Sequence, residues 1–403
     1  MHEELVVKRH WVSDRQFWMA LNYCMLLPGP EAQQLSIYIG WLLHGLRGGI
    51  VAGVFFVLPS VFILLLLSWL YVSFGNLPWM VALFAGLKPA VVAIVAHAVI
   101  RMGGRVLHSI ALWNVAVFSF ISLFVFHVPY PVIILGTAIC GWIGVRHFPK
   151  QFVIEKTNLK FQFDPKAVLP PSELGSPKLR HYSMRVLGIG LLVWWIPVGL
   201  IAMSLGKEHS VVHEALFFSK AALITFGGAY AVLPYVSQQA VENFQWLSTH
   251  QMMDGLGFAE TTPGPLIMVL QFVGFLGAYS QPGGLNPLLS GLVGALITTW
   301  TTFIPSFIFI FLGAPWIERL QHRVTLNAAL VAVTAAVVGM ILYLALWFGW
   351  TVFYSTTHGA NIPSIALSCS IYFALTRLKW NLIKVLAWVA FLSWVAFVCG
   401  WHL

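Results

Sequence analysis

Charged residues are scarce in this chain of 403 residues: only 9% are Asp, Glu, Lys or Arg, whereas 59% are hydrophobic. A soluble domain carries roughly 25% charged residues, so this chain has too little charge to cover a water-facing surface. The mean hydropathy of +0.84 agrees with this. The composition excludes a soluble protein and predicts an all-α polytopic membrane protein whose helices cross a lipid bilayer.

Catalytic and nucleotide-binding motifs are also lacking. The sequence contains no HExxH, GxSxG or GxxxxGK[ST] pattern, so neither a membrane-embedded enzyme nor an ATP-driven pump is predicted. The few cysteines lie in apolar runs without CxxC spacing, and we expect them to pack in the interior without forming a disulfide. The sequence indicates no metal and no cofactor. The four cysteines are Cys24, Cys140, Cys369 and Cys399.

The formal net charge is +9. Much of the excess lies in residues 146–183, which carry seven Lys or Arg against three acids, together with several prolines. Loops rich in Lys and Arg stay on the cytoplasmic side of a membrane. This segment is therefore predicted to be a cytoplasmic basic linker, and no nucleic-acid partner is indicated because no basic-aromatic module is visible. Because residues 1–4 are polar and acidic, we expect no cleavable signal before the first apolar run.

An internal repeat divides the chain. The tripeptide Pro28-Gly29-Pro30 interrupts an apolar region, and it recurs as Pro263-Gly264-Pro265 at an offset of 235 positions (263 − 28). Duplicated halves with a broken helix in each are typical of secondary transporters. We expect a first transmembrane repeat at 1–145 and a second at 184–403. At the same offset Val6, Trp11, Ser13, Gln16, Leu21 and Leu35 match Val241, Trp246, Ser248, Gln251, Leu256 and Leu270.

The apolar runs beside the breaks are too short to cross a hydrocarbon core of about 30 Å. They are therefore predicted to be half-helices that meet inside the membrane, at 17–27 with 35–43 and at 252–262 with 266–279. The remaining apolar runs are predicted to be continuous spans. These lie at 49–74, 78–100, 107–126, 130–145, 186–205, 215–234, 288–312, 325–348, 362–376 and 382–400.

The first repeat is expected to lack one helix. Carried back at the same offset, Phe226 corresponds to a negative position (226 − 235 = −9), so the helix at about 215–235 has no counterpart. One hypothesis is that the chain begins at an internal Met and has lost its first helix. An asymmetric duplication is the alternative.

We expect the two repeats to be inverted, because loops rich in Lys or Arg in one half have almost neutral counterparts in the other. A second group of basic residues matches the start of the linker and favours the same side instead. The first group comprises Lys8, Arg9, Arg15, Arg47, Arg101, Arg105, Arg319 and Arg323, and the second Arg377, Lys379 and Lys384. A homodimer is left open.

The two breaks are predicted to bind a small dianion. Irregular backbone persists inside a membrane only where protein buries it or where it lines a cavity. A proline suits the first turn of a helix, and a helix N-terminus offers free N–H groups and a positive dipole end to an anion. A kink tolerated by packing is the alternative. The candidate substrate-binding residues are Pro28, Gly29, Pro30, Gln33, Gln34, Gly227, Gly228, Thr261, Thr262, Pro263, Gly264 and Pro265.

Few ionisable residues lie within apolar stretches. Lys88 lies near the middle of a predicted span, where an ammonium is costly and usually functional, so it joins the substrate-binding candidates. Its alternative is snorkelling toward the membrane surface. Glu31 and Glu260 flank the two breaks. Either could bind a proton that is coupled to transport, cap a helix end or repel the wrong ligand.

The sequence resembles the chromate ion transporter family in its long, two-domain form. The resemblance rests on residues 27–34 with 38–41, on 226–234 and on 260–265, and it covers nearly the whole chain. It implies an inner-membrane carrier of bacteria that exports chromate, confers chromate resistance and draws on the proton motive force. Chromate is a tetrahedral dianion close to sulfate in shape and charge, so transport of sulfate or another oxyanion, and a passive anion channel, remain the alternatives.

Overall fold

The computed structural model describes residues 1–152, 179–314, 324–355 and 359–399. The first half contains η1 (Glu3–Lys8), α1 (Asp14–Leu26), α2 (Glu31–Phe74), α3 (Pro78–Val106), α4 (Ile110–Phe124), α5 (Tyr130–His147) and α6 (Pro149–Phe152). The second half begins with α7 (Leu179–Leu205), α8 (Ser210–Ile224), α9 (Ala229–Gln238), η2 (Gln239–Asn243), α10 (Thr249–Thr261), η3 (Leu266–Met268) and α11 (Val269–Ser280). It continues with α12 (Pro287–Gly313), α14 (Val324–Phe353), the short pair β1 (Tyr354–Ser355) and β2 (Gly359–Ala360), α15 (Ile362–Thr376) and α16 (Leu382–Val398).

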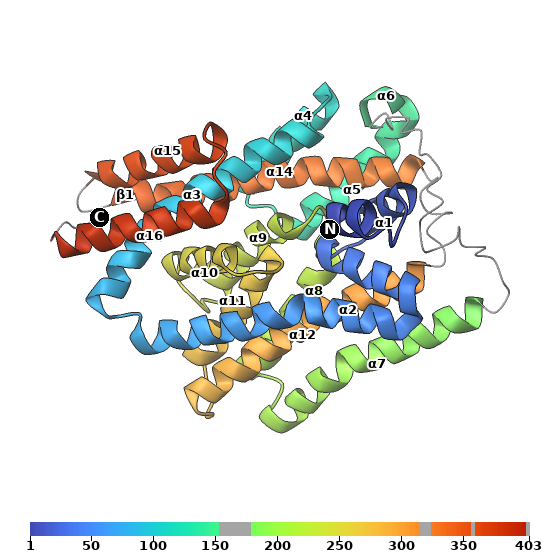
Figure 1. Cartoon of the computed structure of the whole chain (residues 1–403), viewed down its shortest axis with the longest axis horizontal. Helices are drawn as coiled ribbons and strands as arrows, with labels where there is room; N and C mark the ends of the chain where they lie inside the picture. The colour runs from blue at the N-terminus through green and yellow to red at the C-terminus, as the bar shows by residue number, and fades with distance from the viewer. Residues whose placement is uncertain (153–178, 315–323, 356–358, 400–403) are drawn as a thin grey trace.

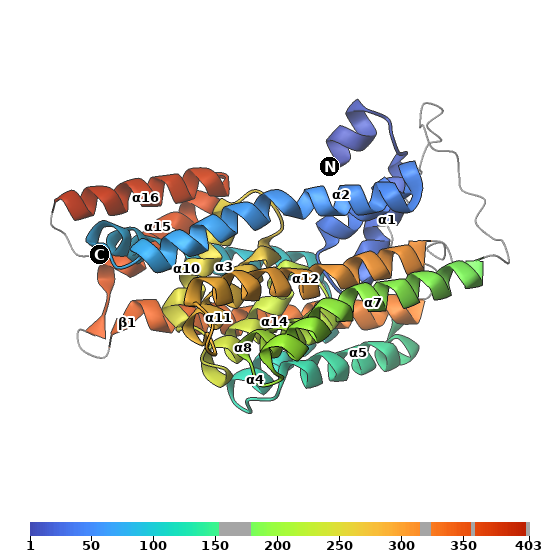
Figure 2. The same ribbon diagram turned by 90° about the horizontal axis from the view of Figure 1, so that it is seen from below.

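Five helices of the described chain are long and apolar enough to cross a membrane: α2, α3, α7, α12 and α14. The long helices α2, α7, α12 and α14 run along the longest dimension of the molecule, and the shorter α8 to α11 lie between them (Figures 1 and 2). α7 exposes apolar side chains such as Ile196, Leu200 and Met203 along the edge of the molecule, as expected for a lipid-facing surface. The prediction of an all-α polytopic membrane protein is confirmed.

The internal repeat is visible in the backbone. α1 and α10 correspond at both ends with the same offset (249 − 14 and 261 − 26 both give 235). Each begins with a capping box, formed by Ser13 and Gln16 in α1 and by Ser248 and Gln251 in α10. A π-helical turn precedes both helices. The two repeats predicted from the spacing therefore also share the same hydrogen-bond pattern at the start of this helix.

The second limb of α2 packs antiparallel to its counterpart α12. α2 folds back at His44 and Gly45, where Gly45 has a φ of +63°, so its first limb ends where the sequence predicted. In the second limb a Cβ at Gly49 would meet Phe311, whereas a Cβ at Gly53 would meet Phe307. Because residue numbers rise along one helix as they fall along the other, equivalent helices run in opposite directions. This is the arrangement expected of inverted repeats.

Two predictions, one about the span at 215–234 and one about the cysteines, were wrong. The span at 215–234 is not continuous: α8 ends at Ile224 and α9 begins at Ala229. Gly227 and Gly228 have φ values of +84° and +91°, a region that favours glycine and that a helix does not use. The cysteines also differ, because only Cys24 is buried, while Cys140, Cys369 and Cys399 are exposed on their helices.

Most of the predicted basic linker, residues 153–178, lies outside the described residues. α7 begins at Leu179, seven residues before the predicted start at 186 (186 − 179), so the described chain is already helical within the last part of the linker range. The cytoplasmic position of this segment, and the domain boundaries at 145 and 184, remain expectations.

Candidate functional site

Three irregular segments that are distant in sequence lie beside one another in the folded chain. In the first break, the backbone N–H of Gly29 donates a hydrogen bond to the carbonyl of Thr225 at 2.7 Å. A Cβ added at Gly228 would lie 3.8 Å from Oε1 of Glu31. Near the second break, the Tyr230 hydroxyl donates to Oε1 of Glu260 at 2.6 Å. The structure therefore brings both Pro-Gly-Pro breaks to the broken helix at Gly227 and Gly228.

Each break also packs against a serine from the opposite repeat. The hydroxyl of Ser60 in α2 donates to the carbonyl of Pro263 at 2.5 Å. In the reciprocal place, a Cβ added at Gly29 would lie 2.7 Å from Oγ of Ser306 in α12. Ser60 and Ser306 follow equivalent prolines, Pro59 and Pro305, inside their helices. Each break is thus contacted by the serine that follows the helix proline of the other repeat.

The first break is the better anion site of the two. Pro30 is the N-cap of α2, one residue before the predicted first turn, and the N–H groups at the start of an α-helix have no partner within it. Gly29 and Pro30 are buried. In the second break, Pro265 precedes the short 3₁₀ turn η3, and Pro263 and Gly264 are exposed. The two helix N-termini predicted to be equivalent are therefore not equivalent.

The two glutamines play different parts. Nε2 of Gln34 donates to the carbonyl of Pro28 at 2.7 Å and so closes the first break on itself. Gln33 is fully buried, and within the described residues neither its Nε2 nor its Oε1 has a hydrogen-bond partner. Buried polar groups are normally paired. Gln33 is therefore the amide donor that this structure leaves available to a ligand.

The two threonines do not offer donors here. The hydroxyl of Thr261 donates to the carbonyl of Phe258 at 2.8 Å, and that of Thr262 donates to Ala259 at 3.1 Å. A hydroxyl has one proton, so both can accept from a ligand but cannot donate to an anion in this conformation. Local bonds to the preceding helical turn use both protons, and the binding role of the two threonines stays a prediction.

Lys88 lies in α3 within electrostatic range of Asp254 and His250 of α10. Asp254 is buried and accepts a hydrogen bond from the Tyr71 hydroxyl at 2.9 Å. At 1.5 Å per residue, Asp254 is roughly 12 Å along α10 from Thr262. Lys88, which is partly buried, therefore lies near the buried carboxylate of Asp254 and away from the second break.

A second cation of α3 is nearer the site and was not among the sequence candidates. Arg101 lies within electrostatic range of Tyr230, which binds Glu260, and its side chain is exposed. From the sequence, Arg101 was expected only to mark the orientation of the membrane spans. Its position near the end of a helix carried no signal for a role at the site.

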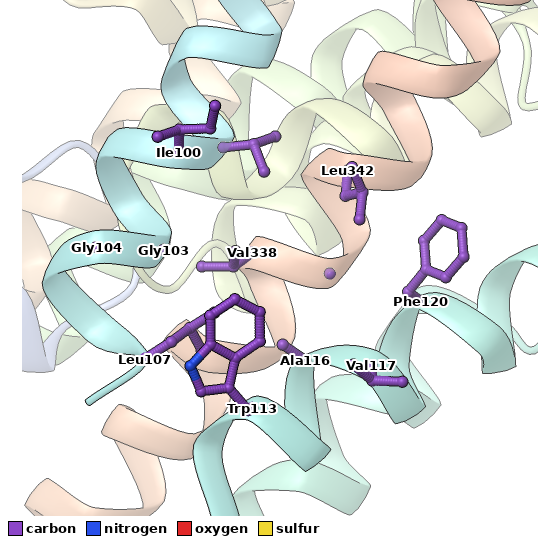
Figure 3. Close-up of a pocket in the computed structure, with 12 residues that line it drawn as sticks. Ile100, Gly103, Gly104, Leu107, Trp113, Ala116, Val117, Phe120, Val338 and Leu342 are labelled. Carbon is purple, nitrogen blue, oxygen red and sulfur yellow. The ribbon is translucent and has the colours of Figure 1, made fainter. Parts of the chain in front are cut away.

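An apolar cavity of about 440 Å³ lies apart from the breaks, between α3, α4 and α14. Figure 3 shows Trp113, Leu107, Val338 and Leu342 around it. Its only side-chain polar atom is the indole nitrogen of Trp113, and Ile100, Trp113 and Val117 are largely exposed. A dianion would lose its hydration here without gaining donors, so this cavity is unsuited to an oxyanion.

Several known proteins are similar to this chain over most of its length. The chain is 28% identical over 349 residues to a probable chromate transport protein of Synechococcus elongatus, covering 85% of this chain and 78% of the relative. It is 28% identical over 347 residues to a chromate transport protein of Cupriavidus metallidurans, covering 85% of this chain and 74% of the relative. The chromate transport protein of Pseudomonas aeruginosa is 26% identical over 407 residues, covering 98% and 86%.

No solved structure matches the chain. The family model described as chromate transporter matches residues 1–142 and 213–396, which together are most of the chain and include all three breaks. The two matched regions fall in the two repeats. The chain therefore belongs to the chromate transporter family.

Proposed function

We propose that this protein is a secondary active transporter that exports chromate across the bacterial inner membrane and thereby confers chromate resistance. The observation that carries the proposal is the meeting of three broken helices at the start of α2, whose first turn holds the buried, unpaired amide of Gln33, in a chain whose relatives are named chromate transport proteins. Discontinuous helices at the interface between two repeats are where secondary transporters bind their substrates. The protein acts as a transporter and not as an enzyme.

The proposed anion position lies at the start of α2. The N–H groups of its first turn and Nε2 of Gln33 would donate to chromate oxygens, and the positive end of the helix dipole would favour the two negative charges. Pro28, Gly29 and Pro30 would shape the backbone there, with Gly227 and Gly228 permitting close approach. The second break, Pro263 to Pro265 with Thr261 and Thr262, would close the site from the other repeat, and Lys88 would raise the local positive potential.

Glu31 and Glu260 are proposed to link proton binding to substrate binding. Glu31 is near Gly228, and Glu260 accepts from Tyr230. An ionised carboxylate repels a dianion, whereas a protonated one does not. Proton binding at these positions would therefore change the affinity of the site for chromate, which is the linkage that coupling to a proton gradient requires.

Chromate uptake into everted membrane vesicles tests the proposal, because export from a cell becomes uptake into such vesicles. We expect saturable uptake that requires a proton gradient and that unlabelled sulfate inhibits only weakly. Strong inhibition together with uptake of sulfate itself would instead make sulfate the substrate. Uptake that is linear in concentration and persists after the gradient is collapsed would indicate a passive anion channel.

A further inference from the structure

Glu214 of α8 is a buried carboxylate outside the site described so far. Its side chain is fully buried, and within the described residues neither carboxylate oxygen makes a hydrogen bond of good geometry. The carboxylate points between α11 and α12: a Cβ added at Gly277 would lie 2.6 Å from Oε1, and one added at Gly294 would lie 2.7 Å from Oε2. The glycines leave the space that this side chain occupies.

The Glu214 carboxylate fills a gap in a ridge of hydroxyls along α12. Ser290, Thr298, Thr302 and Ser306 are spaced so that, with Gly294, each is four residues from the next. Residues four apart on a helix are surface neighbours, with Cβ atoms about 5–6 Å apart. Because Gly294 has no side chain, the Glu214 carboxylate takes its place in the ridge. The ridge thus consists of four hydroxyls and one carboxylate, with a polar group at each of its five positions.

Every hydroxyl of this ridge is buried and has no hydrogen-bond partner in the described residues. Other hydroxyls of the same helix behave differently. Thr299 donates to the carbonyl of Ala295 at 2.8 Å, and Thr301 donates to that of Ile297 at 2.9 Å. Bonding to the preceding turn is the usual way that a helical Ser or Thr is satisfied inside a membrane. The ridge hydroxyls, in contrast, remain available to partners beyond the protein.

Water fits the spacing of the ridge. A water molecule that binds two hydroxyls at about 2.8 Å each spans roughly the distance between neighbouring ridge positions. Buried water is normally found where polar groups lack protein partners. At its far end the ridge reaches the first break, because Ser306 Oγ and Gln34 Nε2 would both lie 2.7 Å from a Cβ at Gly29. At its near end, Ser290 is within the first turn of α12.

We propose that Glu214 is a proton-binding residue of the transport cycle and that the α12 ridge carries a chain of hydroxyls and water from Glu214 to the substrate site at the first break. This inference rests on the proposed function. The carboxylate accepts one proton to become the neutral acid and later releases the same proton, so no other reactant is needed. An ionised carboxylate without donors is unfavourable in an apolar interior, and intramembrane carboxylates commonly serve as proton relays.

No nearby charge offers a competing partner within the described residues. α12 carries no ionisable side chain. None of the ionisable groups on α8, or on the elements that pack around α8, donates a hydrogen bond to the Glu214 carboxylate. These groups are His209, His213 and Lys220 at or on α8, Tyr279 on α11, His181, Tyr182 and Arg185 on α7, Tyr230 and Tyr235 on α9, and Glu242 on η2.

The test uses the purified full chain in proteoliposomes and two transport measurements. One is chromate accumulation driven by a pH gradient, and the other is exchange of labelled for unlabelled chromate without a gradient. Glu214→Gln should retain exchange but lose gradient-driven accumulation, because the substrate site is intact while the residue that passes protons to and from it is gone. Thr298→Val should slow accumulation several-fold. Thr301→Val is the matched control and should behave as wild type, since its hydroxyl is already bonded to the helix.

Gradient-driven accumulation by Glu214→Gln at the wild-type rate would overturn the proposal. So would equal loss of exchange and accumulation, which would make Glu214 part of the substrate site or of the structure. Accumulation that follows a sodium gradient instead of a pH gradient would also contradict it.

A measurement without chromate separates this proposal from the proposed function. Infrared spectroscopy should show a protonated carboxyl band that is missing in Glu214→Gln and that shifts rapidly in D₂O because water reaches the group. A band that persists in the variant would not come from Glu214. A band whose hydrogen does not exchange would show that water does not reach the group. Either result would contradict the proposal. If the wild type neither exchanges nor accumulates chromate, the proposed function fails while the infrared result still decides the role of Glu214.

Discussion

The contact between Ser60 and the second break yields a quantitative prediction for Gly264→Ala. Gly264 has a φ of +141°, and a residue with a side chain in such a region is strained by about 1–3 kcal/mol. The new Cβ would also lie 1.8 Å from Oγ of Ser60. Ser60 must therefore turn away and lose its hydrogen bond to Pro263, which costs about 0.5–1.5 kcal/mol. Together the substitution should lower the free energy of unfolding by about 1.5–4.5 kcal/mol.

A double-mutant cycle isolates the part due to contact. In a Ser60→Ala background the hydrogen bond is already absent, so Gly264→Ala should cost about 0.5–1.5 kcal/mol less than in the wild type. Unfolding in mixed detergent micelles can be followed by the fluorescence of the 18 tryptophans. Gly257→Ala is the control: it lies inside α10, where its Cβ would make ordinary contacts of 3.8 Å or more, and it should stabilise by about 0.5–1 kcal/mol. Additive costs for Gly264→Ala and Ser60→Ala would refute the reasoning.

Three further predictions concern the polar groups near the breaks. Gln33→Leu should abolish chromate transport while leaving stability unchanged or higher, because it replaces an unpaired buried amide with an apolar group of similar size; equal transport at equal protein level would contradict this. Tyr230→Phe removes the hydrogen bond to Glu260 and should reduce kcat/KM by roughly 10- to 150-fold, corresponding to about 1.5–3 kcal/mol, whereas an unchanged value would show that Glu260 has no part in transport. Lys88→Ala should lower both protein level and transport by leaving Asp254 without its cation, and Asp254→Asn should restore the protein level; failure of that rescue would separate Lys88 from Asp254.

The breaks and the repeats could be predicted because they depend on local chemistry. Proline and glycine act on the backbone in any context, so Pro28-Gly29-Pro30 and its counterpart end helices wherever they occur. The capping boxes repeat at the same offset for the same reason. The third break, at Gly227 and Gly228, was predicted as part of a continuous span, although the adjacent glycines were a signal that could have located it.

Contacts between the repeats could not be predicted. The bond from Ser60 to Pro263 joins residues about 200 positions apart and arises only when α2 packs on the second break. The hydroxyls of Thr261 and Thr262 were predicted to face a ligand, but helical geometry brings the preceding carbonyls within reach first. Glu214 lies one residue before the predicted span at 215–234 and was not among the sequence candidates, and its neighbours on α12 come close to it only in the folded chain.

Locating the bound anion tests most directly whether chromate binds at the start of α2. Crystals or frozen samples of the protein with chromate would allow chromium to be located by its anomalous scattering. We expect one chromium position whose chromate oxygens lie within hydrogen-bonding distance of Nε2 of Gln33 and of the first backbone N–H groups of α2. A chromium position beside Lys88 and Asp254, or in the apolar cavity between α3, α4 and α14, would contradict it.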